Sequence, residues 1–124
     1  MAEATIRVIL LPRDTNAHGT IFGGVILSHI DLAGAAEARK NGRHRFVTVA
    51  MRDVEFKRPV YVGDIVSFYT TTTKVGRTSV TVKVDVFAER ADAATVRAKV
   101  TAAELVFVAV DEHGRPTPIA EQVS

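Results

Sequence analysis

The 124-residue sequence contains no cysteine. The protein therefore forms no disulfide, uses no thiolate in catalysis and holds no cysteine-ligated zinc. Its charges nearly balance, with a formal net charge of +2 at pH 7, and aromatic residues make up only 6% of the chain. The basic residues are scattered, so the sequence lacks the basic stripe that is typical of nucleic-acid binding.

Long hydrophobic runs are also missing, because no apolar stretch approaches the roughly 18 to 20 residues that span a membrane. The short apolar stretch near the N-terminus follows Glu3 and precedes no small-residue cleavage site, so we expect a strand there and not a signal peptide. Hydrophobic residues make up 47% of the chain and charged residues 24%, as in soluble globular proteins. We expect one cytoplasmic domain over residues 1–124, with an irregular tail from about residue 112.

A long helix is predicted from about Phe22 to Lys40. Its apolar residues cover nearly the whole circumference: Val25, Ile26, Leu27, Ile30, Leu32, Ala33, Ala35 and Ala36. A helix that is apolar all round is buried all round. We expect only its last turn, with Glu37, Arg39 and Lys40, to face water.

Period-two alternation predicts strands over residues 5–11, 46–56, 65–75, 79–87 and 96–110. In the second strand, the pattern places Val47, Val49 and Met51 on one face and then shifts phase to Val54 and Phe56, which predicts a bulge near Arg52 or Asp53. In the fourth strand, four valines face the interior: Val80, Val82, Val84 and Val86.

The short connections after the helix favour antiparallel neighbours. The sequence therefore predicts an α+β domain, in which a curved antiparallel sheet of about five strands wraps one long central helix. The apolar faces that remain indicate that a second copy of the chain completes the core.

Three motifs in order resemble a known family. "DTNAHGTIFGG" is followed by Asp31, and "FKRPVYVGD" and "KVGRTS" lie downstream. This order and spacing, over about residues 5–118, resemble the hotdog-fold acyl-CoA thioesterases, in the bacterial acyl-CoA hydrolase branch. The resemblance implies hydrolysis of an acyl-CoA, active sites at a dimer interface and a trimer of dimers. It implies no cofactor, since coenzyme A is part of the substrate.

Gly23 and Gly24 open the helix, where the first backbone N–H groups have no intrahelical partner and the helix dipole is positive. Such N–H groups form an oxyanion hole for a tetrahedral intermediate. We expect Gly23 to stabilise the oxyanion and Gly24 to contact the substrate. The alternative is that the two glycines only permit close packing.

Asp31 is a carboxylate among apolar residues, and burying it costs several kcal/mol unless something compensates. We expect Asp31 to be the general base on water or, as an alternative, a nucleophile that forms an anhydride. It lies eight residues after Gly23, hence roughly 12 Å along the axis, so one thioester cannot touch both in one helix. Two antiparallel helices in a dimer would close this gap. The other interpretation is a structural carboxylate that Ser28 or a backbone amide satisfies.

Asn16 resembles the family's loop asparagine, which implies that it orients the attacking water, although an asparagine is also an ordinary loop former. His18 stands where the family commonly has a second asparagine. His18 and His29 are weaker candidates for a general base. The four histidines lack ligand spacing, so no metal site is expected.

The phosphates of coenzyme A need cations, and two turns supply them. We expect coenzyme A to contact the following residues: Arg58, Lys74, Gly76, Arg77, Thr78 and Ser79. Surface cations on a hairpin are the alternative interpretation.

The predicted function is hydrolysis of an acyl-CoA to a free acid and coenzyme A. A hotdog dehydratase is less favoured, because a histidine at the position of Phe22 would have supported it and is absent. A non-catalytic acyl-CoA sensor would keep the cleft and the basic turns, but it has no need of a buried carboxylate. The length of the acyl chain is not determined by the sequence.

Overall fold

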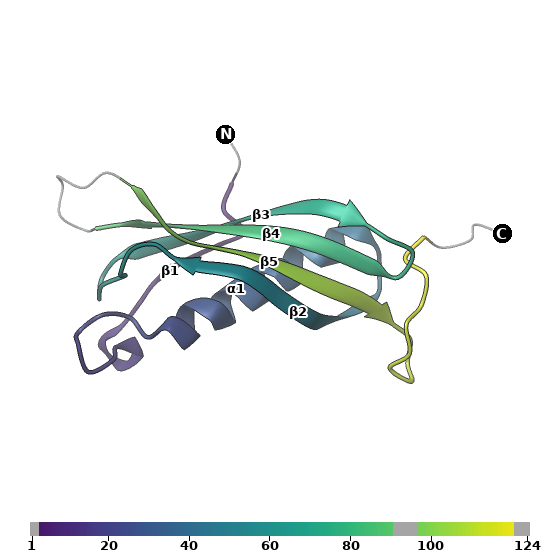
Figure 1. Cartoon of the computed structure of the whole chain (residues 1–124), viewed down its shortest axis with the longest axis horizontal. Helices are drawn as coiled ribbons and strands as arrows, with labels where there is room; N and C mark the ends of the chain where they lie inside the picture. The colour runs from purple at the N-terminus through teal and green to yellow at the C-terminus, as the bar shows by residue number, and fades with distance from the viewer. Residues whose placement is uncertain (1–2, 91–96, 121–124) are drawn as a thin grey trace.

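The structure, a computed structural model, describes residues 3–90 and 97–120. Its elements, in chain order, are β1 (Ile6–Ile9), the 3-10 helix η1 (Pro12–Asp14), α1 (Gly23–Ala38), the 3-10 helix η2 (Arg39–Asn41), β2 (Arg45–Phe56), β3 (Ile65–Val75), β4 (Ser79–Glu89) and β5 (Ala98–Val110). The strands form one arched sheet, and α1 lies along one face of it (Figure 1).

The sheet has the strand order β1-β3-β4-β5-β2, and every neighbouring pair is antiparallel. The predicted α+β architecture is therefore confirmed. The strand predicted over residues 65–75 is observed with those bounds. The first strand is shorter than predicted, and the last begins at Ala98, while Val96 lies outside the described residues.

The tail that follows β5 is irregular, as predicted, yet it packs against the fold. Ile119 is only 6% exposed, and its N–H donates to the carbonyl oxygen of Arg77 at 2.8 Å. Residues 121–124 lie outside the described residues.

The core lies between α1 and the sheet. The four valines of β4 that were predicted to face inward, Val80, Val82, Val84 and Val86, are each 0% exposed. From the helix, Ile26 and Ile30 pack against them in the same cluster. Burying side chains of this size contributes about 1.5–3 kcal/mol each, so this interface fixes α1 on the sheet.

The prediction that α1 is buried all round is wrong for a single chain. The sheet covers one side of the helix, and Leu32 on the other side is 61% exposed. The exposed residues repeat every fourth position: Gly24, Ser28, Leu32 and Ala36. We call these four residues the open stripe of α1. A sheet bends around a helix from one side only, which leaves the opposite side without cover.

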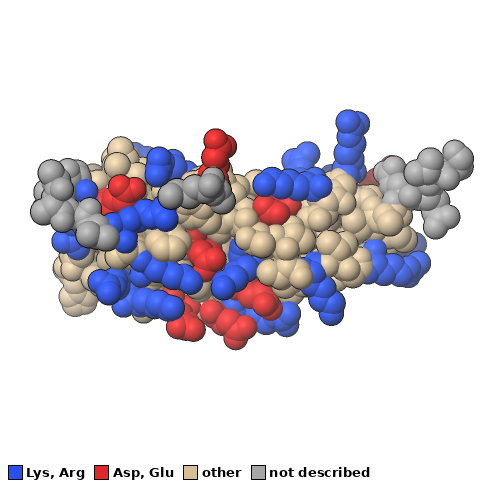
Figure 2. All heavy atoms as spheres, turned by 90° about the horizontal axis from the view of Figure 1, so that it is seen from above, with Lys and Arg blue, Asp and Glu red and all other residues tan. Residues whose placement is uncertain are grey.

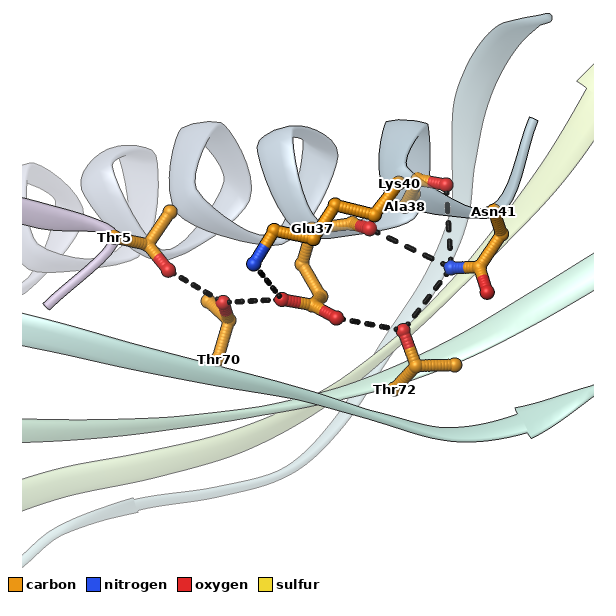
Figure 3. Close-up of polar contacts among 7 residues, drawn as sticks. All are labelled: Thr5, Glu37, Ala38, Lys40, Asn41, Thr70 and Thr72. Carbon is orange, nitrogen blue, oxygen red and sulfur yellow. Dashed lines mark hydrogen bonds and ion pairs between the residues drawn. The ribbon is translucent and has the colours of Figure 1, made fainter. Parts of the chain in front are cut away.

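Glu37 was predicted to face water, and this is wrong as well. Its carboxylate is buried between α1 and β3, where it accepts hydrogen bonds from the hydroxyls of Thr70 at 2.9 Å and Thr72 at 2.8 Å. Lys40 completes the set with an ion pair at 3.2 Å (Figure 3). Burial by itself raises the pKa of Glu37, but the hydrogen bonds from Thr72, Thr70 and Lys40 outweigh it and hold the pKa below its ordinary value.

The same polar cluster closes the end of the helix. The side-chain amide of Asn41 donates to the carbonyl oxygens of Glu37 and Ala38 at 3.4 and 3.3 Å, and to the hydroxyl of Thr72 at 3.0 Å. Helix ends leave carbonyl groups without partners, and Asn41 serves two of them (Figure 3). The cluster therefore fixes the C-terminal end of α1 on β3.

The register between β2 and β5 shifts at two places, one of which was predicted and one of which was not. The predicted bulge is confirmed, since the register with β5 shifts between Arg52 and Glu55 and Asp53 adopts a φ of 55°. A second shift, between Thr48 and Ala50, was not predicted. It makes Val49 the extra residue and breaks the row of Val47, Val49 and Met51.

The second bulge reverses the face on which β2 presents its side chains. Directly opposed residues of antiparallel strands share a face. Thr48 opposes Phe107, and Met51 opposes Leu105, both of which are buried toward the helix. Val47 opposes Val108 and lies on the other face. The bulge thus turns Thr48 toward α1, where regular alternation would have placed Val49.

Candidate active site

Asp31 lies midway along α1 and is half-buried. The Thr48 hydroxyl of β2 donates to its Oδ1 at 2.6 Å. A hydrogen bond to a charged group stabilises by about 1.5–3 kcal/mol, which offsets part of the cost of holding a carboxylate between apolar residues. The alternative partner, Ser28, bonds instead to the carbonyl oxygen of Val25.

Gly23 is the first residue of α1. The preceding residue, Phe22, supplies no side-chain cap, so the first N–H groups of the helix remain available to a ligand. Beside them lies a pocket of about 330 Å³, lined by Ile21, Gly23, Ile26 and residues 56–60. A Cβ on Gly23 would lie 3.5 Å from the ring of Phe56, at ordinary van der Waals distance, so the ring lies directly beside the helix start.

α1 and β2 run in opposite directions. Thr48, near the start of β2, reaches Asp31 midway along α1, and Phe56, at the end of β2, covers Gly23 at the start of α1. Asp31 is then about 12 Å from Gly23 along the helix axis. One protomer does not bring the carboxylate and the oxyanion donors to the same reacting atom.

Asn16 organises the loop before the helix. Its Oδ1 accepts hydrogen bonds from the N–H groups of His18 at 2.8 Å and Thr20 at 3.2 Å. Its Nδ2 donates to the hydroxyl of Thr20 at 2.8 Å. A side-chain amide carries two N–H donors, and one of them accounts for the bond to Thr20. No acceptor in residues 3–90 or 97–120 takes the second donor, which is therefore available to a water or a substrate.

The histidines take part in packing and turns. His29 contacts the carbonyl oxygen of Val25 through Nδ1 at 2.9 Å and stacks on the ring of Phe68. His18 is exposed on the loop, and His44 contacts the carbonyl oxygen of Ile119 through Nε2 at 2.9 Å. Within residues 3–90 and 97–120, no three His, Asp or Glu side chains gather in a way that could hold a metal ion.

The structure divides the cations predicted to bind coenzyme A between two ends of the molecule. Arg58 lines the pocket at Gly23. It also lines a second pocket of about 620 Å³ with Lys57, Arg97 and Lys99. Lys and Arg side chains gather near this end in Figure 2, with Asp and Glu between them. Lys57, Arg97 and Lys99 were missed in the sequence, where only Lys57 stands inside a quoted motif.

The β3–β4 turn lies at the other end, beyond the C-terminus of α1 (Figure 1). At Gly76, a Cβ would lie 2.7 Å from the Oγ of Ser79, so a larger residue there would require the Ser79 side chain to move. The carbonyl oxygens of Arg77 and Thr78 hold the tail and β5 through bonds from Ile119 and Ala109. Lys74 and Arg77 are exposed. Within one protomer, this turn therefore does not meet Gly23.

Among the described residues, no helix is long and apolar enough to cross a membrane.

Comparisons with known proteins agree with this geometry. Residues 18–95 match the family model described as the thioesterase superfamily. The acyl-CoA thioester hydrolase YciA of Salmonella typhimurium is 38% identical over 122 residues, which cover 97% of this chain and 92% of the relative.

Solved structures show the same likeness. A hexameric hotdog-fold thioesterase of Campylobacter jejuni, Cj0915, is 45% identical with a TM-score of 0.91, and the match covers 96% of this chain and 91% of that one. HI0827, a hexameric broad specificity acyl-coenzyme A thioesterase, is 40% identical with a TM-score of 0.89, over 98% and 84% of the two chains.

Proposed function

The chain belongs to the thioesterase superfamily and has its hotdog fold, and from that premise we propose that it hydrolyses acyl-CoA to a free carboxylic acid and coenzyme A. The single observation that carries the proposal is the carboxylate of Asp31, whose Oδ1 accepts a hydrogen bond from Thr48 at 2.6 Å midway along a largely apolar helix. A hydrolase needs a base at the thioester, whereas a protein that only binds acyl-CoA does not.

In the proposed reaction, Asp31 removes a proton from water as the water oxygen adds to the thioester carbonyl. The N–H of Gly23 stabilises the negative oxygen of the tetrahedral intermediate, and the free N–H of Asn16 orients the water. The carbon–sulfur bond then breaks, and the proton held by Asp31 passes to the departing sulfur. A nucleophilic attack by Asp31, with an anhydride as intermediate, is the second route.

The proposed site is shared between two protomers, because one helix cannot bring Gly23 and Asp31 together. With the helices antiparallel about a twofold axis, Gly23 of each chain faces Asp31 of the other. The open stripe of α1 supports this arrangement. Leu32 is 61% exposed in the single chain, and the small residues around it let two helices approach closely. Three such dimers would form the hexamer.

The proposed coenzyme contacts come from both protomers. The C-terminal end of one helix then extends past the start of the other, so the turn at Lys74 and Arg77 of one chain and Arg58 of its partner lie at the same end of the dimer. Gly24 contacts the substrate beside Gly23, while Gly76, Thr78 and Ser79 shape the turn. The proposal includes one thioesterase domain over residues 1–124, no added cofactor and a cytoplasmic location.

A panel of acyl-CoA esters, assayed for released thiol, tests the proposed activity and measures the preferred acyl length. Asp31→Ala should lower turnover by roughly two to four powers of ten, the usual effect of losing a general base. Binding of acyl-CoA without thiol release by the wild-type protein would instead establish a sensor. A variant that unfolds readily, with full activity in its folded fraction, would make Asp31 structural.

The shared site has its own test, in which inactive Asn16→Ala and inactive Asp31→Ala proteins are unfolded together and refolded as a mixture. In a mixed dimer, one site collects both lesions and the other collects neither. Random pairing makes about half of the dimers mixed, so roughly a quarter of the wild-type sites should return. If mixed dimers form without activity above that of each variant refolded alone, each site uses residues of one chain.

A further inference from the structure

Four cations gather where β2 ends and β5 begins. The pocket of about 620 Å³ at this place is lined by Lys57, Arg58, Arg97, Ala98 and Lys99, and we call its four cations the basic patch. Lys57 and Arg58 also line the pocket at Gly23, so the basic patch borders the proposed thioester site. The coenzyme contacts proposed above use Arg58 and leave the other three cations without a role.

The basic patch carries a local excess of positive charge. Three described carboxylates near this end of the sheet already have cationic partners: Asp64 pairs with Arg90, Asp85 with Lys99 and Glu89 with Arg7. No carboxylate in residues 3–90 or 97–120 forms an ion pair with Lys57, Arg58 or Arg97. Because the whole chain has a formal net charge of only +2, the excess belongs to this surface and not to the chain at large.

Arg97 is held in place without losing its charge. The valines of β4 point toward α1, so Asp85 and Phe87 between and after them lie on the outer face of the sheet. Arg97 donates to the hydroxyl of Tyr69 and lies over the ring of Phe87, and both of these groups are neutral. A guanidinium has five N–H donors, and a side chain that is already ordered loses little entropy when a partner binds. Arg97 is therefore ready to bind a carboxylate.

The basic patch extends from the helix start over the length of one pantetheine arm. Phe56 lies beside Gly23, and the next residue, Lys57, donates its N–H to the carbonyl oxygen of Val100 at 2.8 Å. Arg97 precedes Val100 by three positions, so it lies roughly 10 Å further in the same direction, and roughly 14 Å past Phe56. The arm between a thioester sulfur and its phosphate is as long as about four residues of extended chain, also roughly 14 Å.

The spread of these cations suits a protein better than a single phosphate. A phosphate group gathers its cationic partners around one point, whereas Lys57 and Arg97 lie roughly 10 Å apart along the sheet. Successive turns of a helix present side chains about 5–6 Å apart, so an acidic helix could pair with several cations in such a row. The phosphopantetheine arm of coenzyme A is also the arm on which small acidic carrier proteins hold acyl groups.

We propose, on the basis of the proposed thioesterase function, that the basic patch docks an acidic acyl carrier protein, whose thioester the enzyme also hydrolyses. Carboxylates of the carrier pair with Lys57 and Arg97, while the arm enters the pocket at Gly23 and brings the thioester carbonyl to the helix start. Water adds to that carbonyl, the carbon–sulfur bond breaks, and the sulfur of the arm takes the proton. The products are a free acid and a carrier protein with a free thiol.

The first experiment measures thiol release from one acyl group attached to an acyl carrier protein, to coenzyme A and to pantetheine. The kcat/KM for the acyl carrier protein should exceed that for acyl-pantetheine at least about tenfold, because charge complementarity speeds association. If none of the three thioesters is hydrolysed, the proposed function itself is refuted. If acyl-CoA is hydrolysed but the carrier substrate is no better than acyl-pantetheine, only the docking surface is refuted.

The second experiment uses variants of the basic patch. Lys57→Ala should lower kcat/KM for the acyl carrier protein about threefold, the effect of one exposed ion pair, and the double variant with Arg97→Ala about tenfold. Kinetics with acyl-CoA should change less than about twofold. Lys83→Ala is the matched control, because Lys83 is also exposed on the sheet but lies four positions from Phe87, and it should behave as wild type. An equal loss on both substrates would assign the basic patch to coenzyme A and overturn the docking surface.

The third experiment separates the protein surface from the arm. Acyl carrier protein that lacks its arm should inhibit hydrolysis of the acylated form competitively, since it presents the same carboxylates. Added NaCl should weaken this inhibition by screening exposed charges, and the Lys57→Ala, Arg97→Ala double variant should be inhibited less than wild type. Absence of inhibition by the armless carrier would show that the enzyme recognises the arm alone, and would overturn the proposal.

Discussion

At the scale of single residues, α1 carries two carboxylates in different environments. Glu37 accepts bonds from Thr70, Thr72 and Lys40, so both of its oxygens are engaged. From the described residues, Asp31 accepts one hydrogen bond, on Oδ1 from Thr48. A carboxylate oxygen with unused lone pairs can take a proton from water. The distribution of donors therefore suits Glu37 to structure and Asp31 to chemistry.

Thr48 should act as a positioning residue for Asp31. Thr48→Val keeps the shape of the side chain but removes the donor, so kcat should fall about tenfold, which corresponds to one hydrogen bond to a charged group. Thr48→Ser keeps the hydroxyl and should restore most of the kcat. If Thr48→Val keeps full activity and Thr48→Ser loses it, the methyl group matters and the hydrogen bond does not.

Glu37 should make the fold sensitive to acid. Its folded-state pKa lies below the ordinary value of 4.5, so its ionised form adds stability above that value and loses this contribution as the pH falls through the folded pKa. Glu37→Gln should lower the free energy of unfolding at pH 7 by about 1–2 kcal/mol. Urea unfolding between pH 7 and pH 3 should show a smaller loss of stability in Glu37→Gln than in wild type. Parallel pH profiles for the two proteins would contradict this role.

At the scale of elements, β4 and β2 show where sequence patterns succeed and fail. The valines of β4 alternate without interruption, and all four are buried as predicted. In β2, Val49 extends an apparently regular row, yet it is the extra residue of a bulge. Whether an apolar residue at that position points inward depends on its pairing with β5, a contact between distant parts of the chain. Local alternation carries no information on that register.

The same limit explains which site residues the sequence predicted. Asp31, Gly23 and Arg58 stand within ordered motifs, so a resemblance could identify them. Thr48 was missed because its role depends on the bulge, and a threonine in a strand is unremarkable by itself. Glu37 was misplaced because a charged residue in a last helical turn usually faces water. Only the packing of α1 on β3 brings the two threonine hydroxyls to it.

The packing of α1 on the sheet predicts the effect of a single methyl group. A Cβ on Gly34 would lie 3.0 Å from the Cζ of Phe107 and 3.4 Å from the Cδ2 of Leu105, and both side chains are fully buried. Gly34→Ala should therefore destabilise the fold by about 1 kcal/mol, because overpacking of 1–3 kcal/mol exceeds the gain in helix propensity. Gly24→Ala, whose Cβ would meet only Phe22 at 3.7 Å, is the control for chemical unfolding. A Gly34→Ala protein as stable as Gly24→Ala would show that the ring of Phe107 moves freely.

At the scale of the whole molecule, several of the exposed large apolar side chains among the described residues belong to α1 and β2. Leu32 is 61% exposed, Val49 55% and Phe56 53%. These residues belong to α1 and the edge strand β2, which are the elements that carry Asp31 and Thr48. Solved relatives with the same fold are hexameric. In the proposed dimer, the partner covers the same elements that carry the proposed catalytic residues.

Leu32→Lys should separate the protomers without unfolding them. Leu32 makes little contact within its own chain, so the substitution adds little strain to a single protomer, but it places a charged side chain on the apolar face that the partner helix covers in the proposed dimer, where burying an unpaired charge is costly. We expect sedimentation to show monomers, and hydrolysis of acyl-CoA to fall with the loss of dimer. Ile9→Lys, also at an exposed apolar position (56%) but on the opposite edge strand, should leave the dimer intact. An active Leu32→Lys monomer would exclude a shared site.

The strand order also indicates which part of the sheet forms last during folding, and the proposed catalysis depends on that part. β3, β4 and β5 are neighbours both in the chain and in the sheet, whereas β2 pairs with β5 across the 41 residues 57–97. Closing a longer loop costs more chain entropy, so distant strands pair more slowly. The three-strand meander can form early, and β2, with the pocket at Gly23 that it helps to line, joins it late. Elements that join late also open first. Catalysis should accordingly disappear at a lower urea concentration than the β-sheet signal in circular dichroism, and amide hydrogens of β2 should exchange before those of β4.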